Sequence, residues 1–294
     1  MLRRTRDAGG YKDFDAWTSS TSTSTITSKM SIFGLKRRSV ERLDFIVPGA
    51  QKAGTTALHY FLSKHPRIAL PDRQELHFFD DEQIFSQQTV DYELLHRHFG
   101  FVSDKAKAGE VTPSYLYWEP AMERIRNYNP QIKLIILLRN PIDRAFAHWN
   151  MQRFKDREPL DFRPALEEEP RRIAQSVSAG HSLGAGGSIE SRRFAYVDRG
   201  FYSVQLERVF SFFPGPQVKL VKFENFRDRK QETLNDIFDF LGLKPLRRGT
   251  DKDRNVVPYE RAMTADERKY LSEVYGAEIT KLEGMLGWDL SDWR

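Results

Sequence analysis

The sequence of 294 residues contains no cysteine. Disulfides, thiolate nucleophiles, iron–sulfur clusters and cysteine-based zinc sites are therefore excluded, and this composition suits a reducing compartment. No apolar run approaches the roughly 20 residues that a bilayer-spanning helix needs. The N-terminal arginines are not followed by the apolar segment of a secretory signal. We therefore expect a cytoplasmic protein without a membrane span.

The main part of the chain has no excess of either charge. The formal net charge is +5. Residues 1–43 contain nine basic and four acidic residues, which accounts for the whole excess, so the remainder is balanced. A nucleic-acid-binding domain would concentrate basic residues on its folded surface. We therefore expect no nucleic-acid partner.

The first 39 residues have the composition of a disordered tail. From Thr18 to Ser28 every residue except Ile26 is Ser or Thr. Such a segment cannot bury enough apolar surface to offset the entropy of the chain. We predict a disordered, basic, Ser/Thr-rich tail over residues 1–39 and a single domain over residues 40–294.

Strand and helix patterns alternate along this domain. Apolar runs predict strands over residues 44–48, 133–138 and 218–223, and helical spacing predicts helices over 55–64, 143–153, 202–213 and 264–286. The run at 133–138 is continuous, which is typical of a strand covered on both faces. We predict an α/β, P-loop-like fold of three layers, with a central parallel sheet flanked by helices. Residues 157–198 read as irregular.

A glycine loop follows the first predicted strand. Residues 49–56 read Gly-Ala-Gln-Lys-Ala-Gly-Thr-Thr, with the Gly-x4-Gly spacing of a phosphate-binding loop. A nucleoside triphosphate loop has its lysine after the second glycine, where this chain has Thr55. Here the lysine is Lys52, within the loop. The backbone N–H groups at the helix start favour an anion, and we interpret the site as one for a phosphate-like group with a further group bonded to it. An ordinary tight turn is the alternative.

Several segments, in order, resemble sulfotransferases that use 3′-phosphoadenosine 5′-phosphosulfate (PAPS), in particular the heparan sulfate branch and its bacterial relatives. These segments are Gly49–Leu58, Glu75–Asp80, Gly109–Leu116, Leu138–Arg144, Arg199–Tyr202 and Leu286–Trp288. The resemblance implies a metal-independent enzyme that moves a sulfuryl group from PAPS to an acceptor and releases adenosine 3′,5′-bisphosphate.

The resemblance also implies which residues bind the donor. The 5′-phosphosulfate would be held by Gln51, Lys52, Ala53, Gly54, Thr55 and Thr56. Arg139 would bind the 3′-phosphate, for which a permanently charged guanidinium is well suited.

Two further segments bear on donor binding. Where the family has a serine eight residues after the strand-end arginine, this chain has Ala147, so one contact is lost unless Arg144 or His148 replaces it. Lys252 and Arg254 resemble a loop that closes over the nucleotide. A solvated charge run is the alternative for these two.

Sulfuryl transfer needs a group that removes the acceptor's proton. The resemblance places Glu75 at the position of the catalytic glutamate, and we expect it to be partly buried beside Phe78 and Phe79. His77 is the alternative base or a partner of Glu75. Lys52 would neutralise charge on the bridging oxygen. Without the resemblance, an isolated glutamate is usually a solvated surface residue, and a histidine flanked by aromatic residues is usually packed and hydrogen-bonded.

The acceptor site is less well defined. We expect Thr112, Pro113 and Tyr115 to line it, with Tyr115 offering either a stacking surface or ordinary packing. The heparan sulfate enzymes have a lysine where this chain has Val111, which argues against a highly anionic glycan. The candidates are a saccharide, lipid or small-molecule hydroxyl, or an amine, and the sequence sets no oligomeric state.

Two other functions compete with this interpretation. A P-loop kinase or nucleotide hydrolase would need a lysine after the second glycine and a magnesium site, and neither is evident. A non-catalytic nucleotide- or glycan-binding relative is compatible with Ala147 and Val111. Because Lys52, Glu75 and Arg139 are all present, we predict a sulfotransferase.

Overall fold

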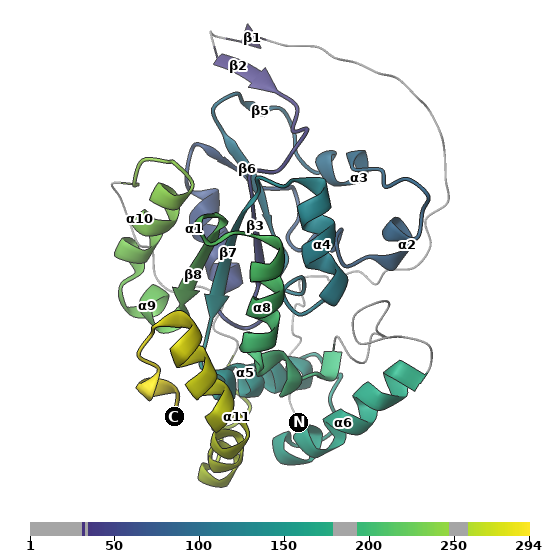
Figure 1. Ribbon diagram of the computed structural model, residues 1–294, viewed down its shortest axis with the longest axis vertical. Helices are drawn as coiled ribbons and strands as arrows, with labels where there is room; N and C mark the ends of the chain where they lie inside the picture. Colours follow the sequence, from purple (N-terminus) through teal and green to yellow (C-terminus); the bar gives the residue numbers. More distant parts are fainter. Residues whose placement is uncertain (1–30, 33–34, 179–192, 247–257) are drawn as a thin grey trace, which may run out of the picture.

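A five-stranded sheet forms the centre of the protein. The structure, a computed structural model, describes residues 31–32, 35–178, 193–246 and 258–294. The strands are all parallel, in the order β4-β6-β3-β7-β8, and Figure 1 shows them between layers of helices. The predicted α/β class is confirmed. The bounds are β3 Phe45–Gly49, β4 Ile68–Ala69, β6 Lys107–Val111, β7 Lys133–Leu138 and β8 Val218–Lys222.

The strand β7 has the environment that its sequence predicts. Its last five residues, Leu134 to Leu138, are fully buried. It pairs with β3 on one side and with β8 on the other, with Leu134 opposite Val218. A strand enclosed by two neighbours and by helices on both faces has no solvent side, which is why its apolar run does not alternate.

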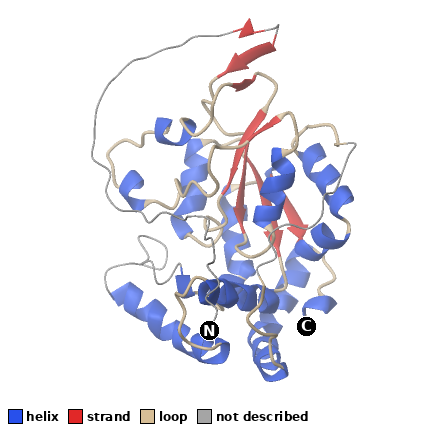
Figure 2. Cartoon of the chain, turned by 180° about the vertical axis from the view of Figure 1, so that it is seen from behind, coloured by secondary structure: helices blue, strands red, loops and turns tan. Residues whose placement is uncertain are grey.

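Helices cover both faces of the sheet (Figures 1 and 2). On one face α1 packs against α9 and α10, with the rings of Phe61 and Phe226 6.1 Å apart. On the other face α4 packs against α8, and α8 against α11. The bounds are α1 Thr55–Ser63, α4 Glu119–Tyr128, α8 Tyr202–Phe212, α9 Phe223–Asp228, α10 Lys230–Phe240 and α11 Ala265–Leu286.

Two helices lie beyond the carboxyl ends of the strands, α5 (Pro141–Phe154) and α6 (Phe162–Ser178). The expectation that residues 157–198 are irregular is wrong for α6. Phe162, Ala165 and Leu166 are buried at helical spacing, so the pattern was present in the sequence. A proline inside the helix, Pro170, made it hard to recognise.

The ordered chain begins earlier than residue 40. A small antiparallel sheet joins β1 (Ser31–Ile32), β2 (Leu35–Arg38) and β5 (Val102–Ser103). Because β2 reads Leu-Lys-Arg-Arg, it carries no apolar alternation, and its pairing with β1 and β5 defines it as a strand. Residues 1–30, which include the Ser/Thr run, lie outside the described residues.

Short elements complete the chain. Thr264 and Glu267 form a reciprocal capping box at the start of α11, the helix that was predicted from its helical spacing. None of the described helices is long and apolar enough to cross a membrane. The remaining elements are α2 Glu82–Phe85, α3 Glu93–His96 and the 3-10 turns Asp198–Gly200, Gly215–Gln217 and Ser291–Trp293.

Candidate active site

The glycine loop connects β3 to α1 and exposes the start of that helix. Gly54 caps α1 with a φ of 89°, and Lys52 also has a positive φ, of 69°. A Cβ on Gly54 would lie 2.9 Å from the ring of Phe223, so only glycine fits here. No side chain caps the helix. Its first N–H groups and the positive end of its dipole therefore form an anion-binding end.

The predicted donor-binding residues of the loop are not equivalent. The N–H of Ala53 donates to the carbonyl of Ala50 over 3.1 Å, so this amide serves the turn itself. Thr55 is buried and Thr56 is half-buried. The Oε1 atom of Gln51 is buried, with no hydrogen-bond partner among the described residues. The amides of Gly54, Thr55 and Thr56 remain the ones placed for an anion.

Arg139 reaches this loop from the neighbouring strand. It follows β7 directly, and Asn140 then caps α5 by accepting a hydrogen bond from the N–H of Ile142. The Nη1 atom of Arg139 donates to the carbonyl of Lys52 over 3.1 Å, and its guanidinium lies 5.0 Å from the centre of the Phe223 ring. Among the described residues no carboxylate forms an ion pair with Arg139. Lys52 and Arg139, the two predicted cations, therefore both lie at the edge of the sheet where the strands end.

The electrostatics of Lys52 suit an anionic ligand. Burial, together with the charges of Arg139 and Lys155, lowers the pKa of Lys52 to about 8, and Glu75 opposes this shift. A bound anion would offset the repulsion between these cations. Lys155, at the end of α5, was not among the predicted site residues. Its position depends on tertiary folding, and no local motif indicates it.

Glu75 and His77 lie together in the loop before α2. Their Oε2 and Nε2 atoms are 3.6 Å apart. The Nδ1 atom of His77 faces the fully buried carboxylate of Asp80 at 3.0 Å, and Asp80 also accepts a 2.6 Å hydrogen bond from Ser114. The sequence places Asp80 in a family segment without giving it a role. The structure makes it the residue that holds His77.

The protonation of His77 follows from these contacts. Burial acts to lower the pKa of His77, but hydrogen bonds with Asp80 and Glu75 outweigh it and raise the pKa to about 10. His77 is therefore a cation at neutral pH and a poor proton acceptor. The side chain of Glu75 is 46% exposed, more open than the partial burial expected from Phe78 and Phe79, which are themselves buried.

The expected acceptor residues do not present their side chains to a cleft. Thr112, Pro113 and Tyr115 are all buried. The hydroxyls of Thr112 and Tyr115 both donate to the carboxylate of Glu110, at 2.9 and 3.0 Å. The prediction of Tyr115 as a stacking surface is therefore wrong, and its alternative, ordinary packing, is right.

The proposed substitutes for the missing serine are also buried. Ala147 lies on α5 with 4% exposure, and the side chains of Arg144 and His148 are fully buried. Arg144 donates to the carbonyl of Tyr196. Burial and the charges of Arg144 and Arg199 lower the pKa of His148 well below its usual value. Neither side chain has surface to offer a nucleotide. Lys252 and Arg254 lie outside the described residues.

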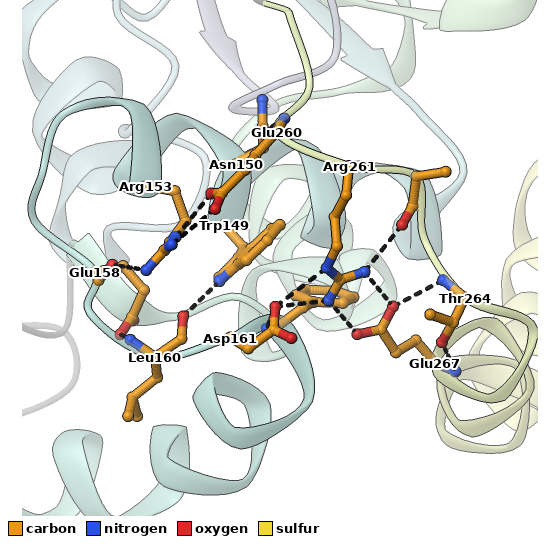
Figure 3. Close-up of polar contacts among 12 residues, drawn as sticks. Trp149, Asn150, Arg153, Glu158, Leu160, Asp161, Glu260, Arg261, Thr264 and Glu267 are labelled. Carbon is orange, nitrogen blue, oxygen red and sulfur yellow. Dashed lines mark hydrogen bonds and ion pairs between the residues drawn. The ribbon is translucent and has the colours of Figure 1, made fainter. Parts of the chain in front are cut away.

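The segment after residue 257 is fixed against α5, the helix that follows Arg139 (Figure 3). The amide of Asn150 donates to the carbonyl of Pro258 and its oxygen accepts from the N–H of Glu260. Arg153 pairs with Glu260, with 2.8 Å between Nη2 and Oε1. Arg261 bridges carboxylates from two other elements, Asp161 and Glu267.

Two hollows lie away from these residues. One, of about 720 Å3, is at the opposite end of the sheet and includes Arg42 and Lys107 in its lining. The other, of about 620 Å3, lies between α6 and α11. Neither is lined by a predicted site residue. Within the described ranges no three His, Asp or Glu side chains are grouped as a metal site requires.

Comparison with known families identifies the chain. The family model of the sulfotransferase domain matches residues 42–256. The chain belongs to the sulfotransferase family. The resemblance to sulfotransferases read from the glycine loop and the other segments is thus confirmed.

Individual relatives agree with this assignment. The sulfotransferase is similar to a solved sulfotransferase structure from Alicyclobacillus acidocaldarius, with 29% identity, a TM-score of 0.70, and coverage of 87% of this chain and 100% of that one. It is 23% identical to membrane-associated sulfotransferase kil1 of Dictyostelium discoideum over 85% of this chain. It is 26% identical to human bifunctional heparan sulfate N-deacetylase/N-sulfotransferase 3 over 88% of this chain. The chain spans 66% and 32% of those two proteins.

Proposed function

We propose that this sulfotransferase binds PAPS between Lys52 and Arg139 and transfers its sulfuryl group in line to an acceptor deprotonated by Glu75. The observation that carries the proposal is the hydrogen bond from Arg139 to the Lys52 carbonyl. It joins Arg139 to the backbone of the loop that carries Lys52, and the charge of Arg139 acts on the Lys52 ammonium. The sequence assigns these two cations to the two ends of the donor.

The glycine loop supplies the donor side of the site. The uncapped N–H groups at the start of α1 bind the 5′-phosphosulfate, and the Lys52 ammonium faces the oxygen between phosphorus and sulfur. In the transfer, the S–O bond to that phosphate breaks while a new bond forms between sulfur and the acceptor atom. The leaving phosphate gains negative charge, which Lys52 neutralises. Arg139 binds the 3′-phosphate.

Glu75 is the base that fits the geometry. Its carboxylate is accessible, whereas the ring of His77 is already protonated and shared between Asp80 and Glu75. The acceptor proton passes to Glu75 as the acceptor attacks sulfur. His77 holds the Glu75 carboxylate in place by charge, and Asp80 and Ser114 hold His77.

A saccharide is the acceptor class that the relatives favour. Several are named for heparan sulfate, among them an N-sulfotransferase and a 3-O-sulfotransferase. We therefore propose a saccharide hydroxyl or amine as the acceptor, with lipid and small-molecule hydroxyls as the competing classes. The balanced charge of residues 44–294 favours a saccharide of low charge. The cytoplasmic location stays a prediction, which cell fractionation tests.

The test is transfer of labelled sulfate from PAPS to a panel of neutral oligosaccharides, N-deacetylated glucosamine oligosaccharides, desulfated heparan, fatty alcohols and small alcohols. We expect label on a saccharide, and none with Lys52→Ala. Transfer only to a lipid or small alcohol would overturn the acceptor class. Binding of adenosine 3′,5′-bisphosphate without transfer to any member would favour the non-catalytic alternative.

A further inference from the structure

The loop that carries Glu75 and His77 has an unusual backbone. Both residues have a φ of 54°, in the left-handed region that side chains with a Cβ rarely adopt. Such a conformation is strained and persists only when its surroundings fix it. Contacts outside the loop must therefore hold this conformation.

Tyr115 makes such contacts with the loop backbone. Its side chain is fully buried. Its hydroxyl oxygen accepts hydrogen bonds from the N–H groups of Phe78 at 2.9 Å and Phe79 at 3.4 Å. Its ring packs edge-on against that of Phe79, with centroids 5.6 Å apart. Tyr115 thus holds the segment that follows His77 through both its hydroxyl and its ring.

Glu110 directs the hydroxyl of Tyr115. This carboxylate, near the end of β6, is fully buried. One of its oxygens accepts a hydrogen bond from the hydroxyl of Tyr115, and the other accepts one from the hydroxyl of Thr112. Because the Tyr115 hydroxyl donates its hydrogen to Glu110, its oxygen lone pairs are available to accept hydrogen bonds from the two loop N–H groups. Removing the hydroxyl would leave those buried groups without this partner.

The same segment is tied to the glycine loop. The N–H of Thr112 donates to the carbonyl of Val47, and the N–H of Leu116 donates to that of Pro48. A Cβ on Gly49 would lie 2.6 Å from the Cβ of Leu116. Residues 110–116 therefore bond through their backbone to the end of β3, where the glycine loop begins, approach Gly49 with Leu116, and contact the 75–80 loop with Tyr115.

We propose that Tyr115 and Glu110 are positioning residues, which fix the 75–80 loop relative to the glycine loop so that Glu75 meets the acceptor in line with the donor. The proposal rests on the role given to Glu75 above. It assigns the family segment at 109–116 a function other than lining the acceptor cleft.

The test compares Tyr115→Phe with Tyr128→Phe. Tyr128 is also buried, and its ring packs against Phe79 with centroids 5.4 Å apart, a contact that Tyr128→Phe keeps. Its hydroxyl, which the variant removes, accepts a 2.7 Å hydrogen bond from the N–H of Leu43 and contacts His96, and neither partner belongs to the 75–80 loop. Both variants lose one buried hydroxyl that accepts from a backbone amide. We expect kcat of Tyr115→Phe to fall about 10- to 100-fold, as misplacement of a reacting group does. Its affinity for adenosine 3′,5′-bisphosphate stays within twofold of wild type, and Tyr128→Phe keeps wild-type kcat.

A spectroscopic readout separates positioning from stability. The His77 ring, assigned by its loss in His77→Gln, is titrated by NMR; it faces Glu75, Asp80 and Ser114. We expect its pKa to move from about 10 toward its ordinary value in Tyr115→Phe and to stay unchanged in Tyr128→Phe. Equal kcat in the two variants, with an unchanged His77 titration, would overturn the proposal.

If Tyr115→Phe does not fold, the variant Glu110→Gln provides a second test. We expect hydrogen exchange at the Phe78 and Phe79 amides to accelerate at least threefold in this variant, while the Leu43 amide held by Tyr128 is unaffected. Unchanged exchange at all three amides contradicts the role of Glu110. If the wild-type protein transfers no sulfate, the proposed function fails, and the titration and exchange measurements still decide whether Tyr115 and Glu110 hold the loop.

Discussion

The guanidinium of Arg139 donates a hydrogen bond to the main-chain carbonyl of Lys52 over 3.1 Å. This contact joins the end of β7 to the glycine loop, although the two residues are 87 positions apart in the chain. Arg139 is thus bound to the loop that carries Lys52, its charge acts on the Lys52 ammonium, and the amides of the helix start beside them have no side-chain cap. Such an arrangement is stabilised most by a ligand that has a negative group at each end, as PAPS has.

Loss of the Lys52 ammonium should remove turnover. In Lys52→Ala we expect kcat to fall at least about 10²-fold, because the charge that develops on the leaving phosphate loses the ammonium that neutralises it. Lys64→Ala, at the other end of α1, is the matched control and should be active. The measurement is steady-state sulfate transfer. A rate near wild type in Lys52→Ala would remove the leaving-group role.

The roles of Glu75 and His77 can be separated by conservative variants. Glu75→Gln should lower kcat by about 10²-fold or more, as loss of a general base does, with unchanged binding of adenosine 3′,5′-bisphosphate. The exposed Glu93, changed to Gln, serves as control. Should His77→Gln show the deeper loss while Glu75→Gln stays active, the histidine is the base.

Donor binding should weaken at alkaline pH. The Lys52 pKa of about 8 means that its positive charge is present below pH 8 and lost above it. The affinity for adenosine 3′,5′-bisphosphate should therefore fall by up to about tenfold between pH 7 and 9. Lys52→Arg keeps its charge over this range and should show no such fall. Calorimetric titration at several pH values checks this, and an identical slope in the two proteins contradicts it.

The ion pairs of Arg261 should stabilise the fold in a pH-dependent way (Figure 3). Its guanidinium contacts Asp161 and Glu267 and lies over the rings of Phe146 and Trp149. The hydrogen bond with Arg261 lowers the pKa of Asp161. Burial acts to raise the pKa of Glu267, but Arg261 and Thr264 lower it. Both carboxylates therefore contribute stability above their unfolded pKa values near 4, and this stability is lost as the pH falls through the folded values.

We expect Arg261→Met to lower the free energy of unfolding by about 1–3 kcal/mol at pH 7, the range of hydrogen bonds to charged groups. The difference from wild type should shrink as the pH falls toward 3. Denaturant unfolding at both pH values measures this. Arg171→Met, which breaks only an exposed pair with Glu168, should change nothing measurable. A pH-independent difference would assign the effect of Arg261 to packing.

The fold was largely predictable because its strongest patterns are local. The continuous run at 133–138, the glycine loop and the helical spacing over 264–286 are each local patterns that indicate one element. The helix α6 was missed because Pro170 interrupts a helical pattern that only burial against other elements resolves. The strand β2 was missed for a similar reason, since this basic segment becomes a strand only through its partners β1 and β5.

The site was predictable where a motif carries it. Lys52, Glu75, His77 and Arg139 were named from their segments. In the structure the Arg139 side chain bonds to the Lys52 carbonyl and its charge acts on the Lys52 ammonium, and the side chains of Glu75 and His77 lie together. The contribution of Lys155, the burial of Tyr115 and the support from Glu110 depend on packing between distant segments. For Tyr115, the Glu-x4-Tyr spacing from Glu110 was the feature of the sequence that could have indicated a supporting role.

The most direct test is calorimetric titration of wild type and Arg139→Met with adenosine 3′,5′-bisphosphate and with ATP plus magnesium. We predict tight, metal-independent binding of the bisphosphate by wild type, at least tenfold weaker binding by Arg139→Met, and weaker binding of ATP with magnesium by both. Equal affinity of wild type and Arg139→Met for the bisphosphate, or a preference for ATP with magnesium, would contradict the placement of the donor between Lys52 and Arg139.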